Sequence, residues 1–262
     1  MPTLDTHQSS EFTKLLYLGD SGSGKTGSLV SLLKAGYKIK ALDLDNGLDP
    51  LVKFGRKAGV DLSLVEFETI RDKYKGSKAG PKVDGTPKAF VEAMELMTKW
   101  SQEEAPDTIF VLDSLTALGR AAYAWANNMN PTAKDKRQIY GMAMGAVEDV
   151  IAMLTGDDFK MNVIVITHVK YDDGDEGTGK GFASSIGKAL GPVIPRYFNT
   201  MIMAEKSGSG SNIKRKIKTM PTNLVDLKIP VPDIDKEFPL ETGMATIFAQ
   251  LRGERVNGST RS

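Results

Sequence analysis

The sequence lacks cysteine, has only two histidines and carries almost no net charge. Without cysteine, its 262 residues can form neither disulfides nor thiolate metal sites, a composition compatible with a cytoplasmic protein. His7 and His168 alone cannot form a histidine cluster. A formal net charge of +1 excludes a molecule that attracts nucleic acid over its whole surface, so any such binding has to come from local patches.

Long apolar runs are absent as well. No run approaches the roughly 18 residues that a membrane span needs, and the polar start of the chain, MPTLDTHQSSEFT, lacks the apolar centre of a signal peptide. We therefore expect no membrane partner. A hydrophobic content of 40% is nevertheless enough for a sizeable core, and the length suits one large α/β domain or two small ones.

The strongest motif is GDSGSGKT, which directly follows the apolar run LLYL and precedes a helix-like segment. It fits the spacing G-x-x-x-x-G-K-[ST] of a phosphate-binding loop. The glycines allow backbone angles that turn successive N–H groups towards an anion, and the following helix adds its N-terminal partial positive charge. The predicted phosphate-binding residues are Gly19, Asp20, Ser21, Gly22, Ser23, Gly24, Lys25 and Thr26.

This loop predicts ATP and Mg²⁺ as cofactors. Lys25 can reach the β- and γ-phosphates, where it would act in catalysis, and the Thr26 hydroxyl can ligate Mg²⁺. Asp113 closes the apolar run TIFVL and supplies the carboxylate expected beside Mg²⁺ at the end of a buried strand. The next residue is Ser114 rather than a glutamate that could act as hydrolytic base, so the base has to come from elsewhere.

The acidic end of the second predicted strand, Asp43-Leu44-Asp45, is the candidate source of this base. The carboxyl ends of parallel strands gather at one edge of a sheet, where ligands bind. Strand alternation makes the side chains of Asp43 and Asp45 point the same way. The alternative for Asp45 is a solvated loop carboxylate without a role.

Strand-like and helix-like segments alternate along the chain, which predicts an α/β domain with a mostly parallel central sheet, helices on both faces and a C-terminal β-hairpin. Residues 1–13 are expected to be a flexible N-terminal segment, 14–251 the core and 252–262 a flexible tail. The basic segment 70–88 and the glycine-rich segment 169–185 are expected to be loops, the second one mobile. Helices are predicted over 25–35, 50–58, from Thr86-Pro87 onwards, 133–155 and 244–251, and strands over 14–18, 38–44, 62–67, 108–112, 162–167, 198–204 and 213–219.

The stretch ALDLDNGLDPLVKFGRKAGVD resembles the corresponding segment of RecA-type recombinases. In that family a glutamate that polarises the attacking water precedes a Leu-Asp-Pro near the adenine. The resemblance implies that Asp45 is catalytic, at the position of that glutamate, and that Asp49 lies beside the base of ATP. The side chain of Asp45 is one methylene shorter than that of glutamate, which implies slow hydrolysis.

Other stretches extend the resemblance over roughly residues 14–251 and imply a RecA-like P-loop NTPase core. VLDSLTAL resembles the Mg²⁺ strand, and VIVITH resembles the strand whose last polar residue senses the γ-phosphate and begins the second DNA loop. His168 stands where RecA has glutamine and takes this catalytic sensing role by resemblance. GKALGPVIPRYFNTMIMAE and KRKIKTMPTNLVDLKIPVP are similar to core-only RecA homologues of bacteriophages, which act in single-strand annealing or DNA recombination in the host cytoplasm.

RecA-type assemblies, whether filament or ring, hold ATP between adjacent subunits, and basic residues of one subunit reach the ATP of its neighbour. Lys214, Lys216 and Lys218 alternate along the strand predicted over 213–219 and therefore share one face. Lys216 and Lys218 are the preferred candidates for such contacts. A basic outer strand that protects a sheet edge explains the same pattern.

The resemblance also implies two DNA loops, one after the Mg²⁺ strand and one after His168. Aromatic side chains interleaved with basic ones suit single-stranded DNA, because bases stack on rings while phosphates pair with cations. The candidate DNA-binding residues are Arg120, Trp125, Lys136, Arg137, Lys170 and Lys180. For each loop, including the basic one around Tyr74, a solvated surface without a ligand is the alternative.

Together these features predict a slow, DNA-stimulated ATPase that binds single-stranded DNA, forms a homo-oligomer and promotes annealing or recombination. A single-stranded-DNA-binding protein is a further candidate partner. Two alternatives remain open. One is a nucleotide-gated assembly module with negligible turnover, and the other is a P-loop small-molecule kinase, although its candidate lid segments are rich in lysine rather than arginine.

Overall fold

A computed structural model describes residues 11–78, 80–172 and 179–253 of the chain. Its centre is an eight-stranded sheet with the order β12-β11-β10-β1-β7-β6-β2-β3, in which the six strands from β10 to β3 are parallel. β11 runs antiparallel to β10 and to β12, so the predicted parallel sheet with a C-terminal hairpin is confirmed. The strands are β1 (Lys14–Gly19), β2 (Lys38–Asp43), β3 (Val65–Thr69), β6 (Thr108–Asp113), β7 (Asn162–Ile166), β10 (Thr200–Ser207), β11 (Lys214–Lys218) and β12 (Glu237–Pro239).

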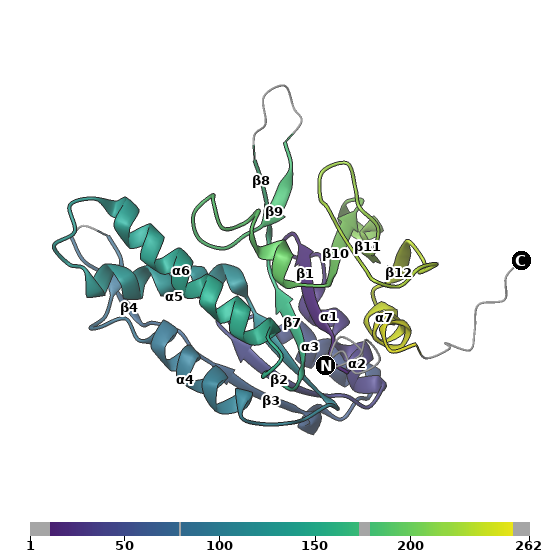
Figure 1. Ribbon diagram of the computed structural model, residues 1–262. Helices are drawn as coiled ribbons and strands as arrows, with labels where there is room; N and C mark the ends of the chain where they lie inside the picture. Colours follow the sequence, from purple (N-terminus) through teal and green to yellow (C-terminus); the bar gives the residue numbers. More distant parts are fainter. Residues whose placement is uncertain (1–10, 79, 173–178, 254–262) are drawn as a thin grey trace, which may run out of the picture.

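Helices cover both faces of this sheet, as predicted (Figure 1). Successive residues of β1 point to opposite faces of the sheet. Leu16 and Leu18 pack into the hydrophobic cluster on one face, and Leu15 and Tyr17 pack into the cluster on the other. The first cluster includes α4 (Ala89–Ser101), α5 (Leu115–Met129) and α6 (Lys136–Thr155). The second includes Leu29, which follows α1 (Lys25–Ser28), and residues of α2 (Val30–Lys34), α3 (Asp49–Ala58) and α7 (Gly243–Leu251).

Helix α5 is absent from the sequence prediction, which placed a DNA loop after the Mg²⁺ strand. Its inward face consists largely of small residues, among them Gly119, Ala122 and Ala126, which give a weak apolar signal but allow close packing. A Cβ on Gly119 would come within 3.0 Å of the main-chain nitrogen of Ile186, so the helix and that segment touch through the backbone. The start of α4 also differs from the prediction, because Asp72 Oδ1 accepts the N–H groups of Lys88 and Ala89 and the helix begins there rather than at Thr86.

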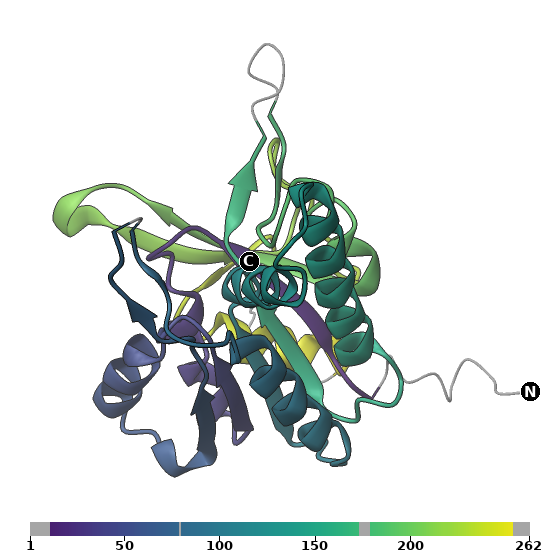
Figure 2. The same ribbon diagram turned by 90° about the vertical axis from the view of Figure 1, so that its left-hand side faces the viewer.

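The segment 169–185, predicted to be a mobile loop, contains β8 (Val169–Tyr171) and β9 (Gly181–Ala183), which pair with each other antiparallel. Both views show these strands projecting from the body of the molecule (Figures 1 and 2). Residues 173–178 of this segment lie outside the described residues. The basic segment 70–88 likewise contains a small antiparallel pair, β4 (Tyr74–Lys75) and β5 (Lys82–Val83).

The packed core begins before Lys14. Phe12 and Thr13, which we expected in a flexible segment, are buried, and the Thr13 N–H donates to Asn162 Oδ1 over 2.9 Å. Residues 1–10 and 254–262, most of the predicted flexible ends, lie outside the described residues. Three 3₁₀ helices complete the described structure: η3 (Leu62–Leu64), η5 (Ile194–Tyr197) and η6 (Gly210–Asn212). No helix within the described ranges is long and apolar enough to cross a membrane.

Candidate nucleotide-binding site

The motif GDSGSGKT forms the turn from β1 into α1, at the edge of the sheet where the parallel strands end. Gly24 caps α1 with φ +99°, a left-handed conformation that favours glycine, and a Cβ there would come 2.5 Å from Leu240 Cδ2. Gly19 is equally restricted, because its Cβ would lie 2.6 Å from the Ala204 carbonyl oxygen. The loop therefore depends on these two glycines for its path around an anion.

Lys25 is buried beneath this loop. Its Nζ donates to the carbonyl oxygens of Gly19, over 2.6 Å, and of Asp20, over 3.0 Å. Burial lowers the pKa of Lys25 to about 8, while the carboxylates of Asp113, Asp20 and Asp45 oppose that shift. A cation held at the mouth of a glycine-rich turn is the arrangement that phosphate groups require.

Thr26 and Asp113 meet although 87 residues separate them in the sequence. The Thr26 hydroxyl donates to Asp113 Oδ2 over 2.8 Å, because α1 begins directly beside the end of β6. Burial raises the pKa of Asp113 to about 6, the Thr26 hydrogen bond opposes this, and the carboxylates of Asp43 and Asp45 add to it. A hydroxyl beside a carboxylate is a fitting donor pair for Mg²⁺. Within the described residues no group of three His, Cys, Asp or Glu side chains could hold a metal, so the nucleotide would have to supply further oxygens.

Asp43 and Asp45 have different surroundings, although strand alternation predicts that their side chains point the same way. Asp43 is only 2% exposed, and its Oδ1 accepts the N–H groups of Asp45 and Gly47, so it fixes the turn after β2. Asp45 lies beyond the end of β2, where strand alternation no longer applies. Its Oδ2 accepts the Ser114 hydroxyl over 2.5 Å, which aims the exposed carboxylate towards the phosphate loop.

A cavity of about 450 Å³ joins these residues in one open site. His168 enters it from the segment between β7 and β8 and is partly buried. Burial lowers the pKa of His168, and the neighbouring charge of Lys25 lowers it further. The imidazole therefore favours its neutral form, which can both donate and accept a hydrogen bond. The residues that line the cavity are Ser21, Gly22, Gly24, Lys25, Thr26, Gly27, Asp45, Gly47, Pro50, Phe54, Asp113, His168 and Arg215.

Asp49, expected beside the base, lies at the start of α3 and forms an ion pair with Lys53 over 3.3 Å. It lines a neighbouring groove rather than this cavity, so its contact with the base stays a prediction.

Phe54 is the aromatic side chain of the cavity and is missing from the sequence prediction. Its ring is 46% exposed and covers Gly27, where a Cβ would come within 2.6 Å of the ring atoms.

Lys216 and Lys218 lie on the outer face of β11, away from the nucleotide cavity of their own chain. Lys216 Nζ is 2.6 Å from Glu237 Oε1, and Lys218 Nζ is 2.8 Å from Glu205 Oε1. Both cations are therefore neutralised within the chain. Contact with a neighbour's ATP would require these ion pairs to exchange, and this role stays a prediction.

Arg215 is the basic residue of β11 that reaches the phosphate loop in its own chain. Its Nε donates to the Gly22 carbonyl oxygen over 2.9 Å, and its guanidinium lines the cavity. The sequence held a signal for this arrangement, because strand alternation puts Arg215 on the same face as the buried Ile217 and opposite the three lysines. A cation on the inward face of a strand needs an anionic or carbonyl partner.

We predict that Arg215→Ala weakens the binding of ATP about tenfold, since hydrogen bonds to charged groups contribute about 1.5–3 kcal/mol. Isothermal titration of an ATP analogue in the presence of Mg²⁺ measures this change. Lys214→Ala is the matched control, because Lys214 is exposed on the opposite face of β11. Equal affinities of the two variants would contradict a role for Arg215.

The candidate DNA residues are dispersed over several elements. The structure places Trp125 on helix α5 rather than in a loop, and its ring packs on Phe90 with 5.1 Å between the ring centroids. Arg120 also lies on α5 but is exposed. The others lie in the first turn of α6 (Lys136, Arg137), on β8 (Lys170) and next to β9 (Lys180). Arg137 pairs with Asp135 and Lys180 with Asp226, and the DNA contacts of all these residues stay predictions.

The base of the β8–β9 hairpin is tied to the nucleotide site by a short hydrogen-bond network. The hydroxyls of Thr116 and Thr167 both donate to the Ser184 carbonyl oxygen, over 2.9 and 2.7 Å. The Ser184 N–H donates to the His168 carbonyl oxygen over 2.8 Å. A movement of the His168 backbone would therefore also move the β8–β9 hairpin, which these hydrogen bonds connect to it.

The fold and the phosphate loop are those of RecA-like P-loop NTPases. The sequence matches the profile of the AAA domain family (AAA_24) over residues 11–231, and the chain belongs to that family. The solved structure of the RadB recombinase is similar in fold, with a TM-score of 0.50 and 18% identity over 88% of this chain and 89% of that chain. None of the curated proteins compared with the sequence matches it.

Two further solved structures resemble the chain less closely, with TM-scores below 0.5. The KaiC-like protein PH0186 from Pyrococcus horikoshii OT3 has a TM-score of 0.45 and 12% identity, over 87% of this chain and 84% of that chain. The flagellar accessory protein FlaH from Methanocaldococcus jannaschii has a TM-score of 0.42 and 11% identity, over 86% of this chain and 83% of that chain.

Proposed function

We propose that the protein is an ATP-dependent single-stranded-DNA-binding ATPase that promotes annealing or strand pairing. The observation that carries this proposal is the position of His168, which lines the nucleotide cavity one residue before β8 and shares the Thr116–Thr167–Ser184 network with the hairpin. A nucleotide that contacts His168 thereby influences a projecting surface element. The fold shared with a recombinase, RadB, supports the same direction.

In this proposal each residue of the cavity has one task. Lys25 binds the β- and γ-phosphates. Thr26 and Asp113 would hold Mg²⁺, which would supply positive charge beside the phosphate oxygens. Asp45, oriented by the Ser114 hydroxyl, accepts a hydrogen bond from the attacking water. Arg215 positions the phosphate loop through the Gly22 carbonyl. His168 donates a hydrogen bond to a γ-phosphate oxygen and relays its presence to β8 and β9.

The assembly is a further part of the proposal. ATP lies between adjacent subunits of a filament or ring, and Lys216 or Lys218 of one subunit exchanges its ion pair for the neighbour's phosphates. The protein acts as a bacteriophage RecA homologue in the host cytoplasm, where a single-stranded-DNA-binding protein shares its substrate. The sequence resemblance supports these points.

The test is the affinity for a labelled oligothymidylate, measured by fluorescence anisotropy with and without a non-hydrolysable ATP analogue and Mg²⁺. The proposal expects binding at least about tenfold tighter with the analogue, a coupling of the size usual for ligand-linked transitions. Micromolar or weaker binding at low salt in both conditions would overturn it. Low salt favours every phosphate contact, so a failure there is decisive.

A nucleotide-gated assembly module with negligible turnover is the second candidate. The outer edge of β3 carries no partner strand in the described sheet, and Phe67 on it is 56% exposed. A groove of about 350 Å³ lies beside it, lined by apolar residues that include Leu51 and Leu62. An open strand edge with an apolar groove suits the docking of a second copy of the chain.

Phosphate release with and without single-stranded DNA separates the candidates. A recombination ATPase is stimulated by DNA, and an assembly module releases almost no phosphate while its mass rises with nucleotide. A small-molecule kinase transfers the γ-phosphate to an acceptor, so it forms ADP without releasing phosphate, and DNA does not change its rate. Mass photometry of the same samples supplies the oligomeric state.

A further inference from the structure

A second cavity, of about 240 Å³, adjoins the nucleotide site. Asp45 lines both cavities, so they share one side chain. The second cavity lies between the segment that follows β3, which contributes Arg71 and Tyr74, and the first turns of α5, which contribute Ala117 and Arg120. The proposed reaction uses none of these four residues.

The acidic side chains of this cavity have hydrogen-bond partners, whereas its two arginines have none among the described residues. Asp45 accepts the Ser114 hydroxyl, and Asp72 Oδ1 accepts the N–H groups of Lys88 and Ala89, so both carboxylates already have partners. Arg71 and Arg120 are exposed, and neither side chain forms a hydrogen bond or an ion pair within the described part of the chain. Two guanidinium groups without partners thus border one small cavity, where they can hold a shared anion.

An aromatic ring borders the same cavity. Tyr74 is 58% exposed and belongs to β4, where it pairs with Val83 of β5. The ion pair between Lys75 and Asp84 lies next to this pairing, so the ring is presented by a short hairpin rather than by an irregular loop. On the opposite wall, the small side chain of Ala117 leaves room for a planar group.

We propose that this cavity binds one nucleotide unit of single-stranded DNA. Arg71 and Arg120 hold the phosphodiester oxygens, and the Tyr74 ring stacks on the adjoining base. Paired arginines match the geometry of phosphate oxygens, and an aromatic ring accepts any base, which suits a strand bound without sequence preference. This inference rests on the proposed binding of single-stranded DNA and names its site.

Because Asp45 lines both cavities, a ligand in the second cavity can influence hydrolysis in the nucleotide site. In the absence of an anion, the positive charges of Arg71 and Arg120 oppose the Ser114 hydrogen bond that holds the Asp45 carboxylate towards the phosphate loop. A bound phosphodiester neutralises these charges and leaves Asp45 to the nucleotide. DNA stimulation of turnover therefore depends on the two arginines.

The double variant Arg71→Ala/Arg120→Ala tests the site. We expect single-stranded DNA to bind at least about tenfold more weakly in the presence of the ATP analogue, because two charge-assisted contacts are lost. DNA stimulation of phosphate release is lost with it, whereas affinity for the nucleotide and the thermal midpoint stay at their original values. Lys34→Ala/Lys99→Ala is the control of equal charge, since both lysines are exposed at the ends of α2 and α4.

Tyr74→Ala and Tyr74→Phe provide a second, charge-neutral comparison. Loss of stacking weakens DNA binding about tenfold in the alanine variant, while phenylalanine retains the ring and the affinity. This pair decides the question even where the double arginine variant fails to fold. Equal DNA affinity and stimulation in the wild type and the variants overturns this site but leaves the proposed function intact, whereas a wild type that does not bind DNA overturns both.

Discussion

Lys25→Ala is expected to reduce the affinity for ATP by at least about 100-fold, because truncating one member of a desolvated charge pair costs about 2–5 kcal/mol or more. The effect is large because Lys25 is the buried cation beneath the phosphate loop, with its Nζ 2.6 Å from the Gly19 carbonyl oxygen. The backbone N–H groups of the loop remain, but they cannot replace a full charge opposite the γ-phosphate. Fluorescence titration with a labelled ATP analogue measures the loss.

Lys160→Ala is the matched control for this variant. Lys160 Nζ forms an exposed ion pair with Glu104 over 3.1 Å, and such pairs contribute only about 0–1 kcal/mol. Its removal should leave the affinity for ATP unchanged. An affinity of Lys25→Ala within threefold of the wild type would place the nucleotide outside this loop, and the proposed function would then lose its site.

The nucleotide site was predictable where local sequence decides the structure. The spacing of GDSGSGKT requires a strand before it and a helix after it, and the structure has β1 and α1 there. Asp113 was found by the same logic, because a continuously apolar run indicates a buried parallel strand and such strands end at one edge of the sheet. The Thr26–Asp113 hydrogen bond follows from these two elements alone.

The features that escaped prediction depend on packing between distant segments. Helix α5 buries alanine and glycine, whose weak apolar pattern hides a helix that fits closely against the backbone near Ile186. Arg215 reaches Gly22 across 193 positions in the sequence. Asp43 and Asp45 looked equivalent in sequence, yet the turn after β2 buries the first and exposes the second. Periodicity specifies which face a residue takes, but it does not specify which loop will cover that face.

Asp45→Asn is expected to lower the rate of phosphate release by about 100-fold or more, the usual contribution of a positioned base. Its carboxylate lines the cavity that contains Lys25 and His168, and the Ser114 hydroxyl fixes its direction. Affinity for ATP should stay the same or rise, because the substitution removes a negative charge that faces the phosphates. Steady-state phosphate release and titration of the analogue separate the two effects.

Ser114→Ala tests whether phosphate release requires the orientation of the Asp45 carboxylate as well as its charge. The Ser114 oxygen also accepts the Ala117 N–H at the start of α5, so this variant is expected to lose about 1 kcal/mol of stability as a lost helix cap. Its turnover should fall less than that of Asp45→Asn, since the carboxylate remains but is no longer aimed. A thermal scan separates the loss of the cap from the loss of turnover.

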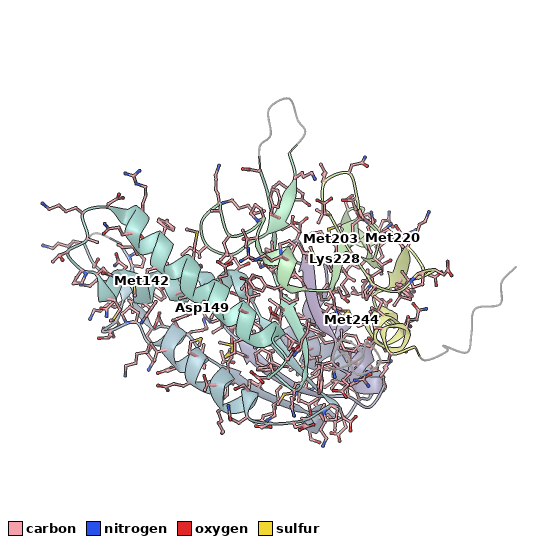
Figure 3. All side chains as sticks on the ribbon, viewed as in Figure 1. Met142, Asp149, Met203, Met220, Lys228 and Met244 are labelled. Atoms are coloured by element: carbon pink, nitrogen blue, oxygen red, sulfur yellow. The ribbon has the colours of Figure 1, made fainter. Side chains whose placement is uncertain are left out.

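Asp149→Asn is the control for Asp45→Asn, because Asp149 is exposed on α6 (Figure 3) and does not line the nucleotide cavity. Equal rates for the wild type and Asp45→Asn, both above background, would move the base to another residue. If the wild type releases phosphate only at the background rate, the assembly module is favoured. Asp45 would then lie near the γ-phosphate without activating water. The rates of phosphate release by the wild type and by Asp45→Asn thus decide between an enzyme and a switch on the same fold.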